Sequence, residues 1–140
     1  MPPKRILLAE THQTFVGVVR LILKDTGSTM LTAGDELSLI EAVTNTRLFD
    51  IVIADLSFPI SSGGNVARLL HRLNPGIKAI ILSVHDEPTV AEECIGAGAK
   101  GFVLKRAIST DLLAAFETVS SGGIYISPAV DLNKHLERYY

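Results

Sequence analysis

Five short apolar runs alternate with stretches of helical periodicity along most of the chain. This alternation limits the fold more than any other feature of the sequence. The runs are too short for buried helices and most are continuous, which is the pattern of strands covered on both faces. They occupy residues 5–9, 28–33, 50–54, 78–83 and 101–105. Strands that alternate with helices predict a parallel sheet with helices on both sides.

Between the runs, apolar residues recur at the i, i+3, i+4 and i+7 spacing of amphipathic helices. The expected helices start near Phe15, Asp35, Val66, Pro88 and either Ser109 or Thr110 as cap. The second includes Leu48, and glycines follow the first and the last helix. The order is (βα)₅. We therefore predict an α/β fold with a doubly wound, five-stranded parallel sheet in the flavodoxin-like order 2-1-3-4-5.

A chain of 140 residues suits one domain with a single core. We assign the folded domain to residues 1–123 and a C-terminal linker or tail to residues 124–140. The tail begins as an extended exit, and residues 129–140 could form a short helix. The run at 28–33 is the most polar of the five, so we expect that strand at a sheet edge.

Composition excludes several classes of protein. With 47% hydrophobic and 20% charged residues, the chain is too apolar to be disordered. Its net charge of −2 gives no excess of positive charge for binding nucleic acid. Cys94 is the single cysteine, so no internal disulfide can form, and we interpret it as a packing residue. The start lacks the apolar core of a secretory signal, and no run approaches the roughly 18 apolar residues of a membrane span. These features predict a cytoplasmic location without membrane contact.

Asp55 ends an apolar strand and leads into a turn containing proline and glycine at residues 56–64. A carboxylate is costly to bury, so its position needs either a turn or a functional explanation. In the predicted topology the carboxyl ends of the other strands carry Glu10, Ser83 and Lys105. Ligands collect at this edge of open α/β sheets, so we expect the four side chains to converge there.

Phosphoryl transfer to an aspartate requires groups of these kinds. The nucleophile is an ionised carboxylate. Cations, typically a lysine and Mg²⁺, neutralise charge on the phosphoryl oxygens. Mg²⁺ takes oxygen ligands, including one or two carboxylates. A hydroxyl on a neighbouring strand can contact the bound phosphoryl group and carry a conformational signal.

Three segments resemble the signature motifs of bacterial response-regulator receiver domains. They are Asp-Leu-Ser-Phe-Pro-Ile-Ser-Ser-Gly at 55–63, Ile-Ile-Leu-Ser at 80–83 and Ala-Gly-Ala-Lys-Gly-Phe-Val-Leu-Lys at 97–105. The resemblance implies Asp55 as phosphoacceptor, Ser83 as switch hydroxyl and Lys105 as the phosphate-contacting lysine. It also implies Phe102, otherwise a core residue, as the rotameric switch aromatic. Mg²⁺ would be held by Glu10, Asp55 and the backbone of Ser57.

Further segments are similar to the NarL/FixJ (LuxR-type) subfamily of transcriptional regulators. They are Val-His-Asp-Glu at 84–87, Lys-Arg at 105–106 and Gly-Gly-Ile-Tyr-Ile-Ser-Pro at 122–128. Members of that subfamily carry a helix-turn-helix DNA-binding domain after such a linker. The resemblance therefore implies either the receiver part of a longer regulator or a stand-alone receiver, with a histidine kinase and a second copy of the chain as partners.

The acidic pair after the first strand is atypical. Receivers usually have two consecutive acidic residues there, and the second commonly binds Mg²⁺ directly, whereas this chain has Glu10 followed by Thr11. A neutral hydroxyl is a poor ligand for a hard dication. Ser62 stands where an acidic or amide residue is frequent. The departure predicts weakened metal binding at this edge.

The predicted function is a two-component receiver that is phosphorylated on Asp55 and remodels the face formed by the fourth helix, fifth strand and fifth helix. It is not predicted to be an enzyme. One alternative is an atypical receiver that binds partners without phosphorylation. Another is an enzyme or small-ligand protein on the same framework, for which no catalytic dyad or cofactor loop is visible. His12 and His85 are interpreted as surface or capping residues rather than metal ligands.

Overall fold

The strands and helices follow the predicted alternation. The computed structural model describes residues 2–45, 48–61 and 64–130, and within these residues six strands form one parallel sheet in the order β2-β1-β3-β4-β5-β6. The strands are β1 (Arg5–Ala9), β2 (Thr29–Ala33), β3 (Ile51–Asp55), β4 (Lys78–Ser83), β5 (Gly101–Leu104) and β6 (Tyr125–Ile126). The helices are α1 (Gln13–Leu23), α2 (Glu36–Thr44), α3 (Val66–Leu73), α4 (Pro88–Gly96) and α5 (Ile108–Ser120), with 3₁₀ turns η1 (Lys24–Thr26) and η2 (Lys105–Ala107).

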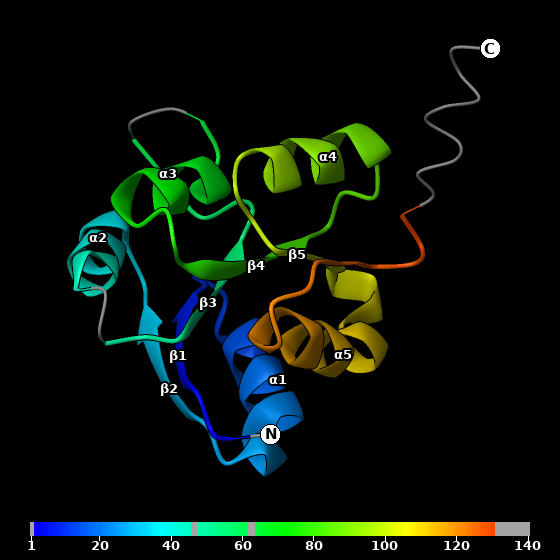
Figure 1. The fold of residues 1–140 in the computed structure, drawn as a ribbon, viewed down its shortest axis with the longest axis horizontal. Helices are drawn as coiled ribbons and strands as arrows, with labels where there is room; N and C mark the ends of the chain where they lie inside the picture. Colours follow the sequence, from blue (N-terminus) through cyan, green and yellow to red (C-terminus); the bar gives the residue numbers. More distant parts are fainter. Residues whose placement is uncertain (1, 46–47, 62–63, 131–140) are drawn as a thin grey trace.

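The sheet lies between two helical layers (Figure 1). Helices α1 and α5 cover one face, and α2, α3 and α4 cover the other. Successive strand residues point to opposite faces, so each layer has its own apolar cluster. Ile6, Leu8 and Ile53 pack with α1 and α5, whereas Leu7 and Val52 pack with the opposite layer. The predicted doubly wound α/β architecture is confirmed.

Helix boundaries follow local capping chemistry at several ends. Gly27 ends the first helical segment with a φ of 73° after η1. The Asp35 carboxylate accepts a hydrogen bond from the Ser38 backbone N–H at 2.8 Å and so caps α2. Pro88 occupies the first turn of α4. Helix α2 ends at Thr44, so the prediction that it extends to Leu48 was wrong.

The fifth helix does not begin with the predicted Ser109 or Thr110 cap. It begins at Ile108, and its N-cap residue Ala107 makes no side-chain capping bond. The turn η2 leads straight into the helix, and the Thr110 hydroxyl donates to the Ala107 carbonyl at 3.0 Å. Because η2 continues directly into α5, the hydrogen bonds of this turn take the place of those that a separate side-chain cap would make.

The order of the five predicted strands is confirmed, and a sixth strand extends the sheet. The expected extended exit pairs in parallel with β5, with Gly101 opposite Tyr125 and Phe102 opposite Ile126. The exposed edge of β5 would otherwise present unpaired backbone groups, which this pairing satisfies. The buried Ser127 donates its N–H to the Phe102 carbonyl at 2.9 Å, and its hydroxyl oxygen accepts from the Leu104 N–H at 3.0 Å. Of the proposed tail helix, residues 131–140 lie outside the described residues.

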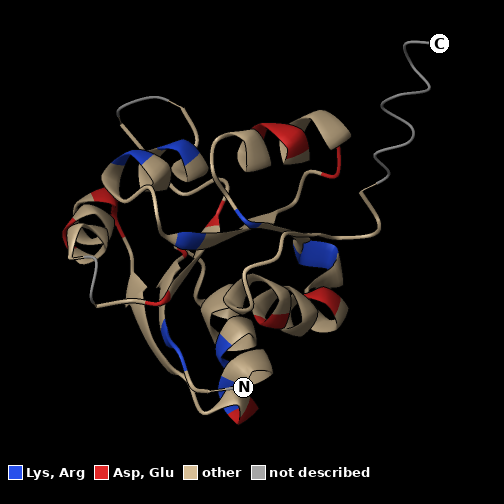
Figure 2. Cartoon of the chain, viewed as in Figure 1, with Lys and Arg blue, Asp and Glu red and all other residues tan. Residues whose placement is uncertain are grey.

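Charged residues of both signs are distributed over the helices (Figure 2). Basic residues lie on α1 and α3, and acidic residues lie on α2, α4 and α5. Strand β2, at one sheet edge as predicted, is largely exposed, and only its last residue, Ala33, is buried. In the part of the chain that the structure describes, no helix has the length and hydropathy needed to cross a bilayer.

Candidate functional site

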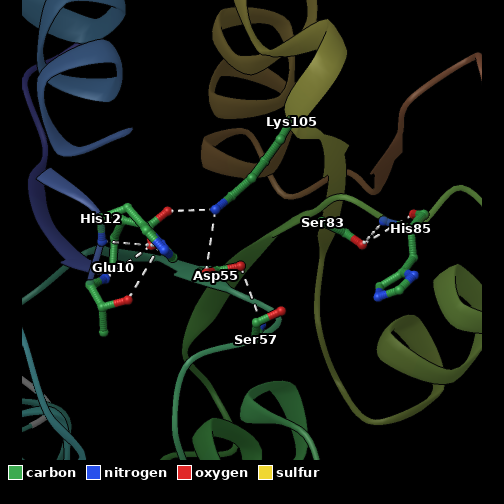
Figure 3. A network of polar contacts seen from close by, with 8 residues as sticks. Glu10, His12, Asp55, Ser57, Ser83, His85 and Lys105 are labelled. Atoms are coloured by element: carbon green, nitrogen blue, oxygen red, sulfur yellow. Dashed lines mark hydrogen bonds and ion pairs between the residues drawn. The ribbon is translucent and has the colours of Figure 1, made fainter. Parts of the chain in front are cut away.

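Three of the predicted site residues meet at the carboxyl edge of the sheet (Figure 3). Glu10 follows β1, Asp55 ends β3 and Lys105 follows β5. The Lys105 Nζ atom lies 2.7 Å from Oε1 of Glu10 and 3.3 Å from Oδ2 of Asp55. All three side chains are buried. The expected convergence of two carboxylates and an ammonium is therefore present, while the roles assigned to these residues stay predictions.

Backbone amides orient both carboxylates. The Ser57 N–H donates to Oδ1 of Asp55 at 3.2 Å. The N–H groups of Thr11 and His12 donate to Oε2 of Glu10 at 3.0 and 3.4 Å. These donors come from the loops that follow β3 and β1. Each carboxylate is thus held by its own strand-end loop, and its remaining oxygen faces Lys105.

An aromatic ring completes the surroundings of Lys105. Its Nζ atom lies 4.0 Å from the centre of the Phe15 ring, which α1 supplies. The ring face attracts a cation and also shields it from water. Sequence reasoning assigned Phe15 only to the apolar face of a helix. No signal in the sequence separates this contact from ordinary packing, because it depends on how α1 meets the sheet edge.

The two carboxyl groups differ in their affinity for a proton. Burial by itself would raise the pKa of Glu10, but the hydrogen bond and the charge of Lys105, together with hydrogen bonds from the His12 N–H and Asp55, outweigh burial, so the pKa of Glu10 is lowered. Burial raises the pKa of Asp55, against the opposing effect of the Ser57 N–H, and the negative charge of Glu10 raises it further. Glu10 therefore carries its negative charge readily, and Asp55 is the carboxyl whose ionised form is costly.

Ser83 and Phe102 make their contacts outside this cluster in the part of the chain that the structure describes. The buried Ser83 hydroxyl accepts from the His85 N–H at 2.8 Å and donates to the His85 carbonyl at 3.1 Å. Figure 3 shows Ser83 beside His85, on the β4 side of the edge. Phe102 is fully buried in the core on β5. Both residues are on the predicted strands. The Ser83 side chain bonds to the loop after β4, and the Phe102 side chain packs in the core.

A divalent cation fits the donor set at this edge. Glu10, His12 and Asp55 each offer one ligand atom, and these atoms all lie within 4.8 Å of one another. Two carboxylates match the preference of Mg²⁺ for oxygen ligands. The Ser57 N–H bonds to Asp55, and the role of the Ser57 backbone as a metal ligand stays a prediction. Thr11 is exposed and adds no charge. Ser62, also singled out in the sequence, lies outside the described residues.

Of the two roles predicted for His12, the surface position is confirmed and side-chain capping is not. His12 occupies the N-cap position of α1, but its side chain makes no capping hydrogen bond. Its Nδ1 atom lies 3.5 Å from Oε2 of Glu10 instead, and 71% of the side chain is exposed. The signal available in the sequence was its position two residues after Glu10. The Nδ1 atom of His85 lies 3.7 Å from Oε2 of Glu87, and His85 is separate from Glu10 and Asp55 (Figure 3).

Comparison with known proteins identifies the family. The sequence matches the response regulator receiver domain over residues 6–117, which is most of the chain. This chain belongs to the response-regulator receiver family. The receiver domain is 42% identical over 84 residues to the transcriptional regulatory protein UhpA of Salmonella typhimurium, covering 60% of this chain and 41% of UhpA. It is 27% identical over 128 residues to the probable transcriptional regulatory protein NarL of Mycobacterium tuberculosis, covering 90% of this chain and 59% of NarL.

A solved structure supports the same assignment. The crystal structure of a LuxR-family two-component response regulator from Aurantimonas sp. superposes with a TM-score of 0.83 at 26% identity, and 99% of each chain is covered. The predicted resemblance of the receiver domain to NarL/FixJ (LuxR-type) regulators is confirmed. The chain spans about half the length of the curated relatives that it matches.

Proposed function

We propose that Asp55 accepts a phosphoryl group from a histidine kinase and that this receiver domain thereby controls an output. The observation that carries the proposal is the buried contact of Lys105 with both Glu10 and Asp55, at 2.7 and 3.3 Å. Placing a cation beside a strand-end carboxylate meets the main requirement of phosphoryl transfer, which is charge neutralisation around the transferred group.

In the transfer step an Asp55 carboxylate oxygen attacks phosphorus. A new P–O bond forms, the P–N bond to the kinase histidine breaks, and its electron pair returns to the imidazole nitrogen. Lys105 leaves Glu10 and contacts a phosphoryl oxygen, while the Ser57 N–H keeps the Asp55 carboxyl group oriented. A divalent metal ion held by Glu10, Asp55 and the Ser57 backbone would supply further positive charge to the phosphoryl oxygens.

The switch that follows uses Ser83 and Phe102. The Ser83 hydroxyl has to give up the hydrogen bond that it donates to the His85 carbonyl in order to donate to the phosphoryl group. Such a move draws in the loop between β4 and α4, and the buried Phe102 ring on β5 repacks with it. The phosphoryl group shifts the population toward this arrangement only because it contacts that state better. The remodelled surface is the face formed by α4, β5 and α5.

The output is control of transcription in the cytoplasm. The relatives named above are transcriptional regulators, which favours a signalling switch over an enzyme. A second copy of the chain is the proposed partner of the remodelled face, and a separate helix-turn-helix domain is the proposed DNA-binding element. The net charge of −2 argues against direct DNA binding by residues 1–140. No comparison supports the alternative of an interaction module that works without phosphorylation.

Intact-mass spectrometry after incubation with acetyl phosphate tests the proposal. We expect one phosphoryl adduct on the wild type, dependent on a divalent metal, and none on Asp55→Asn. Asp50→Asn is the matched control, because Asp50 lies just before the same strand, at the end opposite Asp55, and pairs with Arg5. An adduct that persists in Asp55→Asn contradicts the proposal. So does an unmodified wild type under conditions that phosphorylate a control receiver.

A further inference from the structure

The side chain of His12 places a nitrogen ligand beside the two buried carboxylates. One of its ring nitrogens belongs to a group with carboxylate oxygens of Glu10 and Asp55 whose ligand atoms lie within 4.8 Å of one another. The ring is largely exposed, at 71%, and can rotate toward a bound ion without disturbing the core. This inference concerns the same site as the proposed function and specifies which cation that site selects.

The balance of buried charge favours a cation here. Glu10 is 1% exposed and Asp55 is 4% exposed, and Lys105 is the cation that contacts both. With both carboxylates ionised, these three groups carry one uncompensated negative charge. Buried charge is costly unless it is paired or binds a metal.

The chemistry of the ligands decides which cation fits. Thr11 provides a neutral hydroxyl where a second carboxylate is expected, and this removes part of the hard-oxygen character that Mg²⁺ prefers. His12 adds an imidazole in the next position. Imidazole suits zinc, nickel, iron and copper, whereas sites of carboxylate and carbonyl oxygens alone suit magnesium, calcium and manganese.

We propose that Glu10, Asp55 and His12 bind a first-row transition-metal dication in preference to Mg²⁺. Three protein ligands leave coordination positions for water and for phosphoryl oxygens, as an open metal site requires. The Thr11 hydroxyl lies 3.5 Å from Nδ1 of His12, so it sits beside this ligand and does not replace it. His12 is the residue that compensates for the missing carboxylate.

Isothermal titration of the metal-free chain with Ni²⁺ and with Mg²⁺ tests the proposal. We expect one Ni²⁺ per chain, bound about 100-fold more tightly than Mg²⁺. His12→Ala should weaken Ni²⁺ binding by about 10–100-fold and leave Mg²⁺ binding within about twofold. His85→Ala is the matched control, since its ring is comparably exposed, at 54%, and faces Glu87. The Co²⁺ absorption spectrum of wild type and His12→Ala reports directly on nitrogen coordination.

A second variant tests whether the missing carboxylate at residue 11 sets the preference against Mg²⁺. Thr11→Asp restores the carboxylate and should raise Mg²⁺ affinity far more than Ni²⁺ affinity. Equal affinities of the wild type for the two ions would overturn the proposal, as would equal losses of Ni²⁺ affinity in His12→Ala and His85→Ala. Both histidine side chains are exposed, so circular dichroism should show native folding in each variant.

The titration requires no phosphoryl donor, so its result is separate from that of the proposed function. If acetyl phosphate leaves no adduct on Asp55 but His12-dependent Ni²⁺ binding is observed, the phosphoacceptor role fails and the metal assignment holds. If Asp55 is phosphorylated with Mg²⁺ and His12→Ala binds Ni²⁺ as the wild type does, the metal assignment fails and the phosphoacceptor role holds.

Discussion

The Lys105 ammonium lies 2.7 Å from a carboxylate oxygen of Glu10, although 95 residues separate them in the chain. In the sheet, β3 and β4 lie between the strands that carry these two residues, so the lysine reaches past both strand ends. Its second contact, with Asp55 at 3.3 Å, lies along that path. A phosphoryl group on Asp55 would compete with Glu10 for the Lys105 ammonium. Phosphorylation of Asp55 would therefore change the ion pair between Lys105 and Glu10.

Asp55→Asn should raise the melting temperature at pH 7 in the absence of divalent metal, on the order of a few degrees. The pKa of Asp55 is raised above 3.8 in the folded chain, chiefly by burial. A raised pKa means that stability is lost as the pH rises from 3.8 through the folded pKa, and the full penalty is present above it. Asparagine carries no charge, so the gain should shrink as the pH falls through that window. Thermal melts at pH 7 and pH 4.5 check this, and a lower melting temperature for the variant at pH 7 would count against it.

Asp50→Asn should lower the stability of the fold at pH 7, the opposite of the effect expected for Asp55→Asn. Hydrogen bonds from the side chain and backbone of Arg5 lower the pKa of Asp50 below 3.8, and the N–H of Arg5 lies 2.7 Å from Oδ2. The stabilisation is present above pH 3.8 and is lost as the pH falls through the folded pKa. The pair is partly exposed, so we expect a loss of about 0.5 kcal/mol at pH 7.

Urea unfolding of Asp50→Asn at pH 7, and again in acid below pH 3.8, measures this loss. The difference from wild type should narrow at the lower pH. Asp25→Asn, an exposed aspartate in η1, is the control and should change little at either pH. A deficit in Asp50→Asn that stays constant across the pH range would exclude the Arg5 interaction as its cause.

Ser127→Ala should destabilise the domain by about 1–3 kcal/mol. The Ser127 hydroxyl oxygen accepts the buried Leu104 N–H at 3.0 Å, and alanine leaves that donor without this partner. Urea unfolding gives the change in stability, and hydrogen exchange at the Leu104 amide should accelerate as well. Ser121→Ala, at an exposed position after α5, should be nearly neutral. Equal stabilities of the two variants would show that the Ser127 contact contributes nothing.

The Cys94 thiol should not react in the native chain. Its side chain is fully buried on α4, and burial raises its pKa to about 11. Only the thiolate is nucleophilic, and at pH 8 its population is then very small. Ellman's reagent should detect no thiol in the native protein and one in denaturant, since Cys94 is the only cysteine. Rapid labelling under native conditions would contradict the packing of α4 onto the sheet.

The sequence by itself determined the strands, most helices and the strand order. These follow from local apolar periodicity and from the turn chemistry of residues such as Asp35 and Gly27. Periodicity is set by near neighbours in the chain, so it can be read without the fold. The placement of Glu10, Asp55 and Lys105 at one edge followed as well, because parallel strands end on the same side.

The tertiary structure decided what depends on distances between segments far apart in the chain. Pairing of Tyr125 and Ile126 with β5 became favourable only because that sheet edge was open. The Phe15 ring reached Lys105 only because α1 packs beside the strand ends. The nitrogen of His12 faces Glu10 instead of capping α1 because the loop after β1 turns it there. The local sequence pattern specifies the helices and strands. The direction of side chains at their ends depends on packing between distant segments, which a short stretch of sequence does not specify.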